Sequence, residues 1–195
     1  MLLLIYWLYV WEIVKCSTIV ITTIFALILL FHGINEPSFR IAIRFTARYS
    51  CILFLLAFTA SSLRRLKPTP LNNWLLTNRR YLGLSMAVSH GFHAIAIVGV
   101  AILTTDMMQN NLDAYLGYLF IILMTITSFK RPAAILGRRK WRILHTLGMY
   151  YLWLSFTVAF GMRLNESWLL YSPFVVVLSL AFLLRFLPVK KLHHT

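Results

Sequence analysis

Acidic residues are scarce in this chain. Only 5 of its 195 residues are Asp or Glu, against 19 Lys and Arg, so the formal net charge is +14 at pH 7. Such an excess of basic residues is typical of nucleic-acid-binding proteins. However, charged residues make up only 12% of the chain and hydrophobic residues 60%, whereas soluble domains are about 25% charged and 45–50% apolar. The composition excludes a soluble nucleic-acid-binding domain, and we predict no nucleic-acid partner.

Cysteine and glycine motifs are also missing. The two cysteines, Cys16 and Cys51, form no CxxC pair, which argues against a thiol redox motif and a cysteine zinc site. We expect Cys51 to be buried inside an apolar helix as a small hydrophobic residue. No glycine-rich dinucleotide fingerprint occurs, so any redox chemistry needs a separate electron donor.

Long apolar runs are what the chain has in abundance. A membrane-spanning helix needs roughly 20 apolar residues, and the backbone in hydrocarbon must satisfy its own hydrogen bonds, which favours helices. We therefore predict an all-α polytopic membrane protein, one domain over residues 1–195 built as a six-transmembrane-helix bundle. The predicted spans are 16–33, 41–62, 81–104, 114–129, 142–162 and 168–187, and the fourth is short enough that we expect it to extend into its flanking loop.

The basic residues predict the orientation of these spans. With six spans, 15 of the 19 fall on one side, and we expect that side to be cytoplasmic. Both termini are then cytoplasmic in a multi-pass protein of the inner (plasma) membrane, with membrane lipid as a partner. The 15 are Lys15, Arg64, Arg65, Lys67, Arg79, Arg80, Lys130, Arg131, Arg138, Arg139, Lys140, Arg142, Arg185, Lys190 and Lys191.

Three histidines lie inside predicted spans, where ionisable residues are costly and usually functional. His90 and His93 stand three residues apart in the third span, so both project toward roughly one helical face. His145 lies in the fifth span, which runs parallel to the third. Imidazoles from two helices are able to hold one haem iron from opposite sides, although His145 is only a few residues into its span. Hydrogen bonding between helices is the alternative role.

Two other patterns have more than one interpretation. Gly83, Ala87 and Gly91 form a stripe of small residues, which favours close helix packing but also leaves room for a flat macrocycle. Arg44 and Arg48 lie one turn apart at the outer end of the second span, near its first residues. They either extend toward the membrane surface or pair with haem propionates or a quinone carbonyl.

Several motifs resemble the ferric reductase-like transmembrane family, in particular the haem-binding membrane subunits of bacterial periplasmic methionine sulfoxide reductase systems. They are TASSLRRL at 59–66, NRRYLGL at 78–84 followed by His93, and TSFKRPAAILGRRKWRILHTLGMYY at 127–151, which contains His145. The resemblance covers roughly residues 40–155 and places His93 and His145 on haem-ligand histidines.

The resemblance implies a six-helix bundle that holds haem b and moves electrons across the membrane. The expected donor is a cytoplasmic flavin reductase or quinol, with FMN or quinone as a further cofactor, and the acceptor is an external redox protein. The chain departs from the family pattern at Val158, where a second histidine usually follows the first by about thirteen residues. We therefore expect one haem, with His93, His145 and His90 as candidate axial ligands to its iron.

Two alternatives remain from the residues themselves. The loss of the histidine at position 158 fits a structural or assembly subunit that kept the bundle and lost full haem ligation. A transporter or metal permease is the other alternative, but such carriers commonly place carboxylates in mid-membrane, and we expect Asp106 and Asp113 to lie in a loop.

Overall fold

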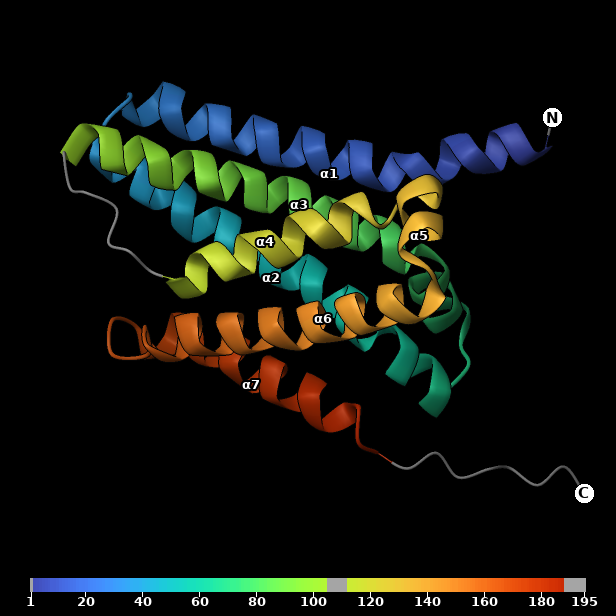
Figure 1. The fold of residues 1–195 in the computed structure, drawn as a ribbon. Coiled ribbons are helices and arrows are strands. Elements are labelled where there is room, and N and C mark those ends of the chain that lie inside the picture. Colours follow the sequence, from blue (N-terminus) through green and yellow to red (C-terminus); the bar gives the residue numbers. More distant parts are fainter. Residues whose placement is uncertain (1, 105–111, 188–195) are drawn as a thin grey trace, which may run out of the picture.

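The computed structural model describes residues 2–104 and 112–187, and all regular secondary structure in these ranges is helical. The helices cross back and forth between two ends of an elongated bundle (Figure 1). Their bounds are α1 Leu2–His32, α2 Glu36–Leu66, α3 Pro70–Thr104, α4 Leu112–Ile126, α5 Lys130–Leu136, α6 Arg138–Gly161 and α7 Trp168–Leu184.

Local signals fix both ends of α2. The Asn35 side chain caps the first turn by accepting a 3.0 Å hydrogen bond from the Ser38 amide, and Pro37 occupies a first-turn position where its missing N–H costs nothing. At the other end Lys67 is extended. Pro68 follows it, and a residue before proline is disfavoured in the helical conformation. The sharp α2–α3 connection follows from these residues.

The core of the bundle is the α2–α3 pair, which packs along most of its length. Small residues line this contact, among them Ser50, Ala57, Ser85 and Ser89, all of them buried. The Ser50 hydroxyl donates to the Ser89 hydroxyl over 2.9 Å. Close backbone approach through small residues, with hydroxyl bonds between helices, is how membrane helices associate without a hydrophobic driving force.

Four helices are long and apolar enough to cross a membrane: residues Trp11–His32 of α1, together with α2, α3 and α6. The bent pair α4 and α5 brings the number to five if it forms one broken span. α7 is apolar but has only 17 residues, about 26 Å at 1.5 Å per residue, against about 30 Å of hydrocarbon. The all-helical prediction is confirmed for the described residues, and four to five helices are apolar enough to span a membrane, whereas the number of six spans is not confirmed.

The fourth predicted span, 114–129, corresponds to α4, which begins two residues earlier and does not continue straight beyond Ile126. α4 ends at Ile126, and after a short break α5 leaves at an angle of 107° to it. Pro132 lies in the first turn of α5, and Gly137 joins α5 to α6 with a φ of +78°, which glycine adopts without strain. The chain after α4 therefore turns across the end of the bundle. Asp113, expected in a loop, lies in the first turn of α4, and Asp106 is outside the described residues.

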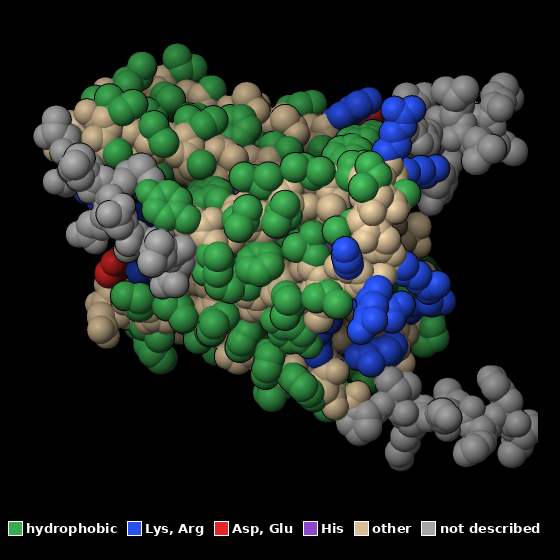
Figure 2. Space-filling view, viewed as in Figure 1, with side chains coloured by type: hydrophobic (Ala, Val, Ile, Leu, Met, Phe, Trp, Pro, Cys, Tyr) green, Lys and Arg blue, Asp and Glu red, His purple; other side chains and the backbone are tan. Residues whose placement is uncertain are grey.

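Charge is divided between the two ends of the bundle. Lys and Arg side chains gather at one end and apolar side chains cover the middle (Figure 2). We call the end at which α2 ends and α3 and α6 begin the basic end. α1 starts and α7 ends there as well (Figure 1). Large apolar side chains such as Leu30, Ile102 and Leu180 are exposed on the outer faces of the helices, as expected for contact with lipid.

Two predictions about small residues have different outcomes. Cys51 is fully buried in α2, as predicted. Close packing is wrong for Gly83 and Gly91, because a Cβ atom built on either glycine meets no atom within 4 Å, whereas Ala87 packs against the core. The close contact of α3 is made instead by Ser85 and Ser89, which are displaced around the helix from the glycines and face α2.

Candidate functional site

Two cavities lie inside the bundle, and together they contain all three predicted site histidines. The first, which we call the paired-histidine cavity, has a volume of about 710 Å³ and is lined by His90 and His93. The second, the His145 cavity, has a volume of about 300 Å³. Both lie within or at the lower limit of the roughly 300–1,000 Å³ typical of ligand sites. Ile121 of α4 lines both of them.

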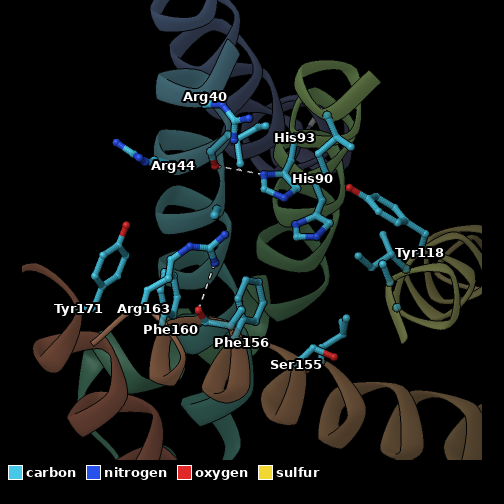
Figure 3. A pocket seen from close by; sticks show the side chains of 18 of the residues that line it. Arg40, Arg44, His90, His93, Tyr118, Ser155, Phe156, Phe160, Arg163 and Tyr171 are labelled. Carbon is cyan, nitrogen blue, oxygen red and sulfur yellow. Dashed lines mark hydrogen bonds between the residues drawn. The ribbon is translucent and has the colours of Figure 1, made fainter. Parts of the chain in front are cut away.

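The paired-histidine cavity is formed by α2, α3, α4 and α6, and it is closed at one side by the α6–α7 connection and the start of α7. His90 and His93 point into it from α3, and Tyr118 of α4 faces His90 (Figure 3). The two imidazole centroids are 5.0 Å apart. The prediction that both histidines share one helical face is confirmed.

His93 is held by α2 in a defined tautomer. Its Nδ1 lies 2.9 Å from the Thr46 hydroxyl and 3.2 Å from the Ile43 carbonyl oxygen. A carbonyl oxygen only accepts, and the single Thr46 hydroxyl proton is already directed to the Ala42 carbonyl at 2.8 Å. Nδ1 of His93 therefore carries the proton and donates, which leaves Nε2 with a free lone pair. A histidine that binds a metal usually has this arrangement of its other nitrogen.

His90 has no comparable anchor. Its Nδ1 is shielded from solvent and has no hydrogen-bond partner. The ring is enclosed by Tyr118, at 5.4 Å between centroids, and by Phe156 of α6, at 5.9 Å and nearly perpendicular. A buried polar atom without a partner costs about 1–3 kcal/mol, so a ligand that supplied one would be stabilised here.

Arginines line the paired-histidine cavity at the end of the bundle opposite to the basic end. Arg40 pairs with Glu36 at 2.6 Å, and Arg163 donates to the Ala159 carbonyl at 3.1 Å. Arg44 lines the cavity and has no hydrogen bond or ion pair within the described residues. Arg48 is not part of the lining; its guanidinium lies 5.4 Å from the centroid of the Tyr171 ring. Of the two arginines singled out in the sequence, Arg44 alone reaches the cavity.

His145 has a different environment. Its Nε2 lies 3.1 Å from the Thr127 hydroxyl, and that hydroxyl donates to the Leu123 carbonyl at 2.7 Å. Nε2 is therefore the protonated nitrogen of His145. Trp141 stacks on the imidazole at 4.2 Å and donates from Nε1 to the Thr127 carbonyl at 2.9 Å. These contacts tie the first two turns of α6 to the end of α4, where the chain bends into α5.

The structure does not bring His145 together with the α3 histidines. Counted from the basic end, His145 is the seventh residue after the start of α6, whereas His90 is the twentieth after the start of α3. At 1.5 Å per residue this is a difference of about 20 Å in height. Val158, the position of the missing second histidine, is 48% exposed on the outer face of α6. The α6 side chains that face the paired-histidine cavity include Ser155, Phe156 and Ala159.

A further observation describes the chemistry of these cavities. No group of three or more His, Cys, Asp or Glu side chains suited to a metal ion occurs within residues 2–104 and 112–187.

Sequence reasoning missed Thr46 and Tyr118, the polar neighbours of the two α3 histidines. A signal for Thr46 was present, because a threonine inside an apolar span needs a polar partner, but the partner became identifiable only when α2 and α3 were placed side by side.

No protein-family model, curated protein or solved structure matches this chain.

Proposed function

We propose that the chain is a haem-binding membrane subunit whose haem would sit in the paired-histidine cavity, with Nε2 of His93 holding its iron. The observation that carries this proposal is the orientation of His93: Nδ1 donates to Thr46 and Ile43, so the free lone pair is on the nitrogen farther from the backbone. Haem b is commonly held by a histidine of this kind. The choice between His90 and His93 follows from this anchor.

The rest of the cavity suits the remaining parts of a haem. Its wall includes apolar and aromatic side chains from four helices, such as Ile97, Leu152 and Phe156, which match a macrocycle. Arg40, Arg44 and Arg163 stand at one end of the lining, where two propionates would find charge-assisted hydrogen bonds. Among these, Arg44 is the strongest candidate because no described carboxylate pairs with it.

The residues of this cavity fit the binding of a haem iron by a histidine of α3 alone. They do not fit the expected pair, in which His145 of α6 supplies the second imidazole. His90 and His93 project from the same side of α3, so they cannot occupy the two opposite faces of one macrocycle, and His145 lines the other cavity. The α6 side chains that line this cavity include no imidazole. Haem would supply one-electron chemistry at its iron. His93 would orient it, and the surrounding apolar side chains would exclude water.

Transfer of electrons across the membrane is part of the proposal. With no dinucleotide fingerprint in the chain, the donor is a separate flavin reductase or quinol and the acceptor is a redox protein on the opposite side. The motifs at 59–66, 78–84 and 127–151 support membership of the ferric reductase-like transmembrane family.

The test is the haem content and absorption spectrum of the detergent-purified full chain, expressed with ample haem. We expect one haem per chain, a loss of at least tenfold in haem affinity in His93→Ala, and a near-normal haem content in His145→Ala. His145→Ala is a matched control because it removes an imidazole from the other cavity. Equal loss in both variants, with normal elution from a sizing column, would contradict His93 as the only histidine ligand and favour a bis-histidine site.

A structural or assembly subunit is the second candidate, and the outward position of Val158 favours it. With Val158 outside the cavity, α6 supplies no imidazole to the paired-histidine cavity. Folded wild-type protein without haem in any preparation would select this candidate. Normal partner binding by the His93→Ala variant would then be expected as well.

A further inference from the structure

The His145 cavity has the chemistry of an anion site. It lies under the bend between α4 and α5, at the basic end, and its lining includes Arg79, Arg80 and Lys130 together with apolar residues of α2, α3, α4 and α6. None of these three cations takes part in the ion pairs found within the described residues, which join Glu12 to Lys15, Glu36 to Arg40 and Glu166 to Arg163. Their counter-charge must come from outside the described chain.

Arg80 is the cation of this cavity with a buried N–H group that lacks a hydrogen-bond acceptor within the described residues. Its Nε is shielded from solvent and has no hydrogen-bond partner, while its guanidinium lies 5.6 Å from the ring centroids of Tyr81 and Phe129. Both rings therefore lie near the guanidinium, while its Nε has no acceptor among the described residues. Arginine presents its N–H groups in a planar fork that matches phosphate.

The apolar part of the cavity shows that the partner is amphipathic. Ala57, Met86, Ala87, Met124 and Met149 line the space on the side away from the cations. Gly83 also lines it, and a Cβ atom at Gly83 would meet nothing within 4 Å. A charged group held at one end and hydrocarbon at the other is the arrangement of a phospholipid at the level of its headgroup.

We propose that the His145 cavity binds the phosphate of one anionic phospholipid, with Arg79, Arg80 and Lys130 as its ligands and the first part of an acyl chain along Gly83 and Ala87. Basic pockets between membrane helices bind such headgroups. Three cations in one lining suit the charge of a phosphate, and the apolar residues of the same lining favour a lipid over free phosphate. This inference does not depend on haem binding in the other cavity.

The experiment is native mass spectrometry of the full chain in detergent, titrated with phosphatidylglycerol in the presence of a tenfold excess of phosphatidylcholine. We expect one phosphatidylglycerol to stay bound to the wild type. Arg79→Gln with Arg80→Gln should weaken binding at least tenfold. The matched control is Arg138→Gln with Arg139→Gln, which removes the same charge from the basic end but from residues that do not line the cavity, and its affinity should stay within twofold of the wild type.

Gly83→Leu is the second variant, because it fills the cavity without changing charge, and it should also abolish tight binding. Similar weakening in both arginine pairs would overturn the proposal in favour of diffuse attraction to the basic end. Binding unaffected by Gly83→Leu would overturn it as well. In a third arm inorganic phosphate replaces the lipid. Displacement of phosphatidylglycerol by millimolar phosphate, or equal binding of phosphate alone, would identify free phosphate as the ligand and reject the lipid.

Discussion

The two cavities differ in what their histidines already do. His93 uses one ring nitrogen to fix its orientation and keeps the other free, and the neighbouring His90 has an unpartnered Nδ1. His145 is bonded to Thr127 and covered by Trp141, and its contacts hold α6 against the end of α4. A histidine inside a membrane helix is therefore a poor indicator of a cofactor by itself. The two histidines differ in which nitrogen is bonded, Nδ1 in His93 and Nε2 in His145, and in what surrounds the ring, because Trp141 stacks on His145 while His93 faces the larger cavity.

The largest expected effect comes from supplying the missing second imidazole. Ala159→His should place an imidazole in the lining of the paired-histidine cavity, where it would give the proposed haem a second histidine ligand and change its absorption spectrum. Val158→His is the matched control, because that position is on the outer face and should leave the spectrum as in the wild type. Absorption and electron paramagnetic resonance spectra of the purified proteins measure the difference. A spectral change in Val158→His alone would contradict the placement of Val158 on the outer face of α6 and of Ala159 in the cavity.

A smaller effect is expected from the anchor of His93. Thr46→Val removes the hydroxyl that accepts from Nδ1, and the loss of such an outer partner typically costs about 10–100-fold in metal affinity. We expect the lower end of that range, because the Ile43 carbonyl still accepts at 3.2 Å. Haem titration measures the change, and Thr59→Val is the control, since the Thr59 hydroxyl bonds only within its own helix. An unchanged affinity would remove Thr46 from the site.

The smallest expected effect comes from removing the hydrogen bond between His145 and Thr127. Thr127→Val removes the acceptor of the His145 Nε2 proton, and an inter-helix bond of this kind contributes about 1 kcal/mol in membrane proteins. The free energy of unfolding in mixed micelles should fall by about that amount, with haem content unchanged. Thr157→Val is the control, because the Thr157 hydroxyl bonds only to the Trp153 carbonyl of its own helix. Loss of haem in Thr127→Val would contradict the assignment of haem binding to the paired-histidine cavity alone.

The sequence predicted the helical class and the positions of α2, α3 and α6, because apolar runs of this length have one solution in a membrane. It also predicted that His90 and His93 share a face, since helical periodicity alone decides that. It did not predict the bend after α4, although Pro132 in the first turn of α5 and Gly137 directly after its end are typical of such breaks. The predicted pairing of His93 with His145 is not found. It required both histidines to lie at the same distance from the basic end, but α3 begins eleven residues before the predicted start of its span, which places His93 farther from that end.

The position of Ile121 has a consequence for the space inside the bundle. Its side chain is 6% exposed and lines both cavities, one beside the arginines of the far end and the other at the basic end. Ile121 is the side chain that the linings of these two cavities share, so it stands between them. A smaller residue at position 121 would join the two spaces into one larger cavity that reaches from the α3 histidines to His145.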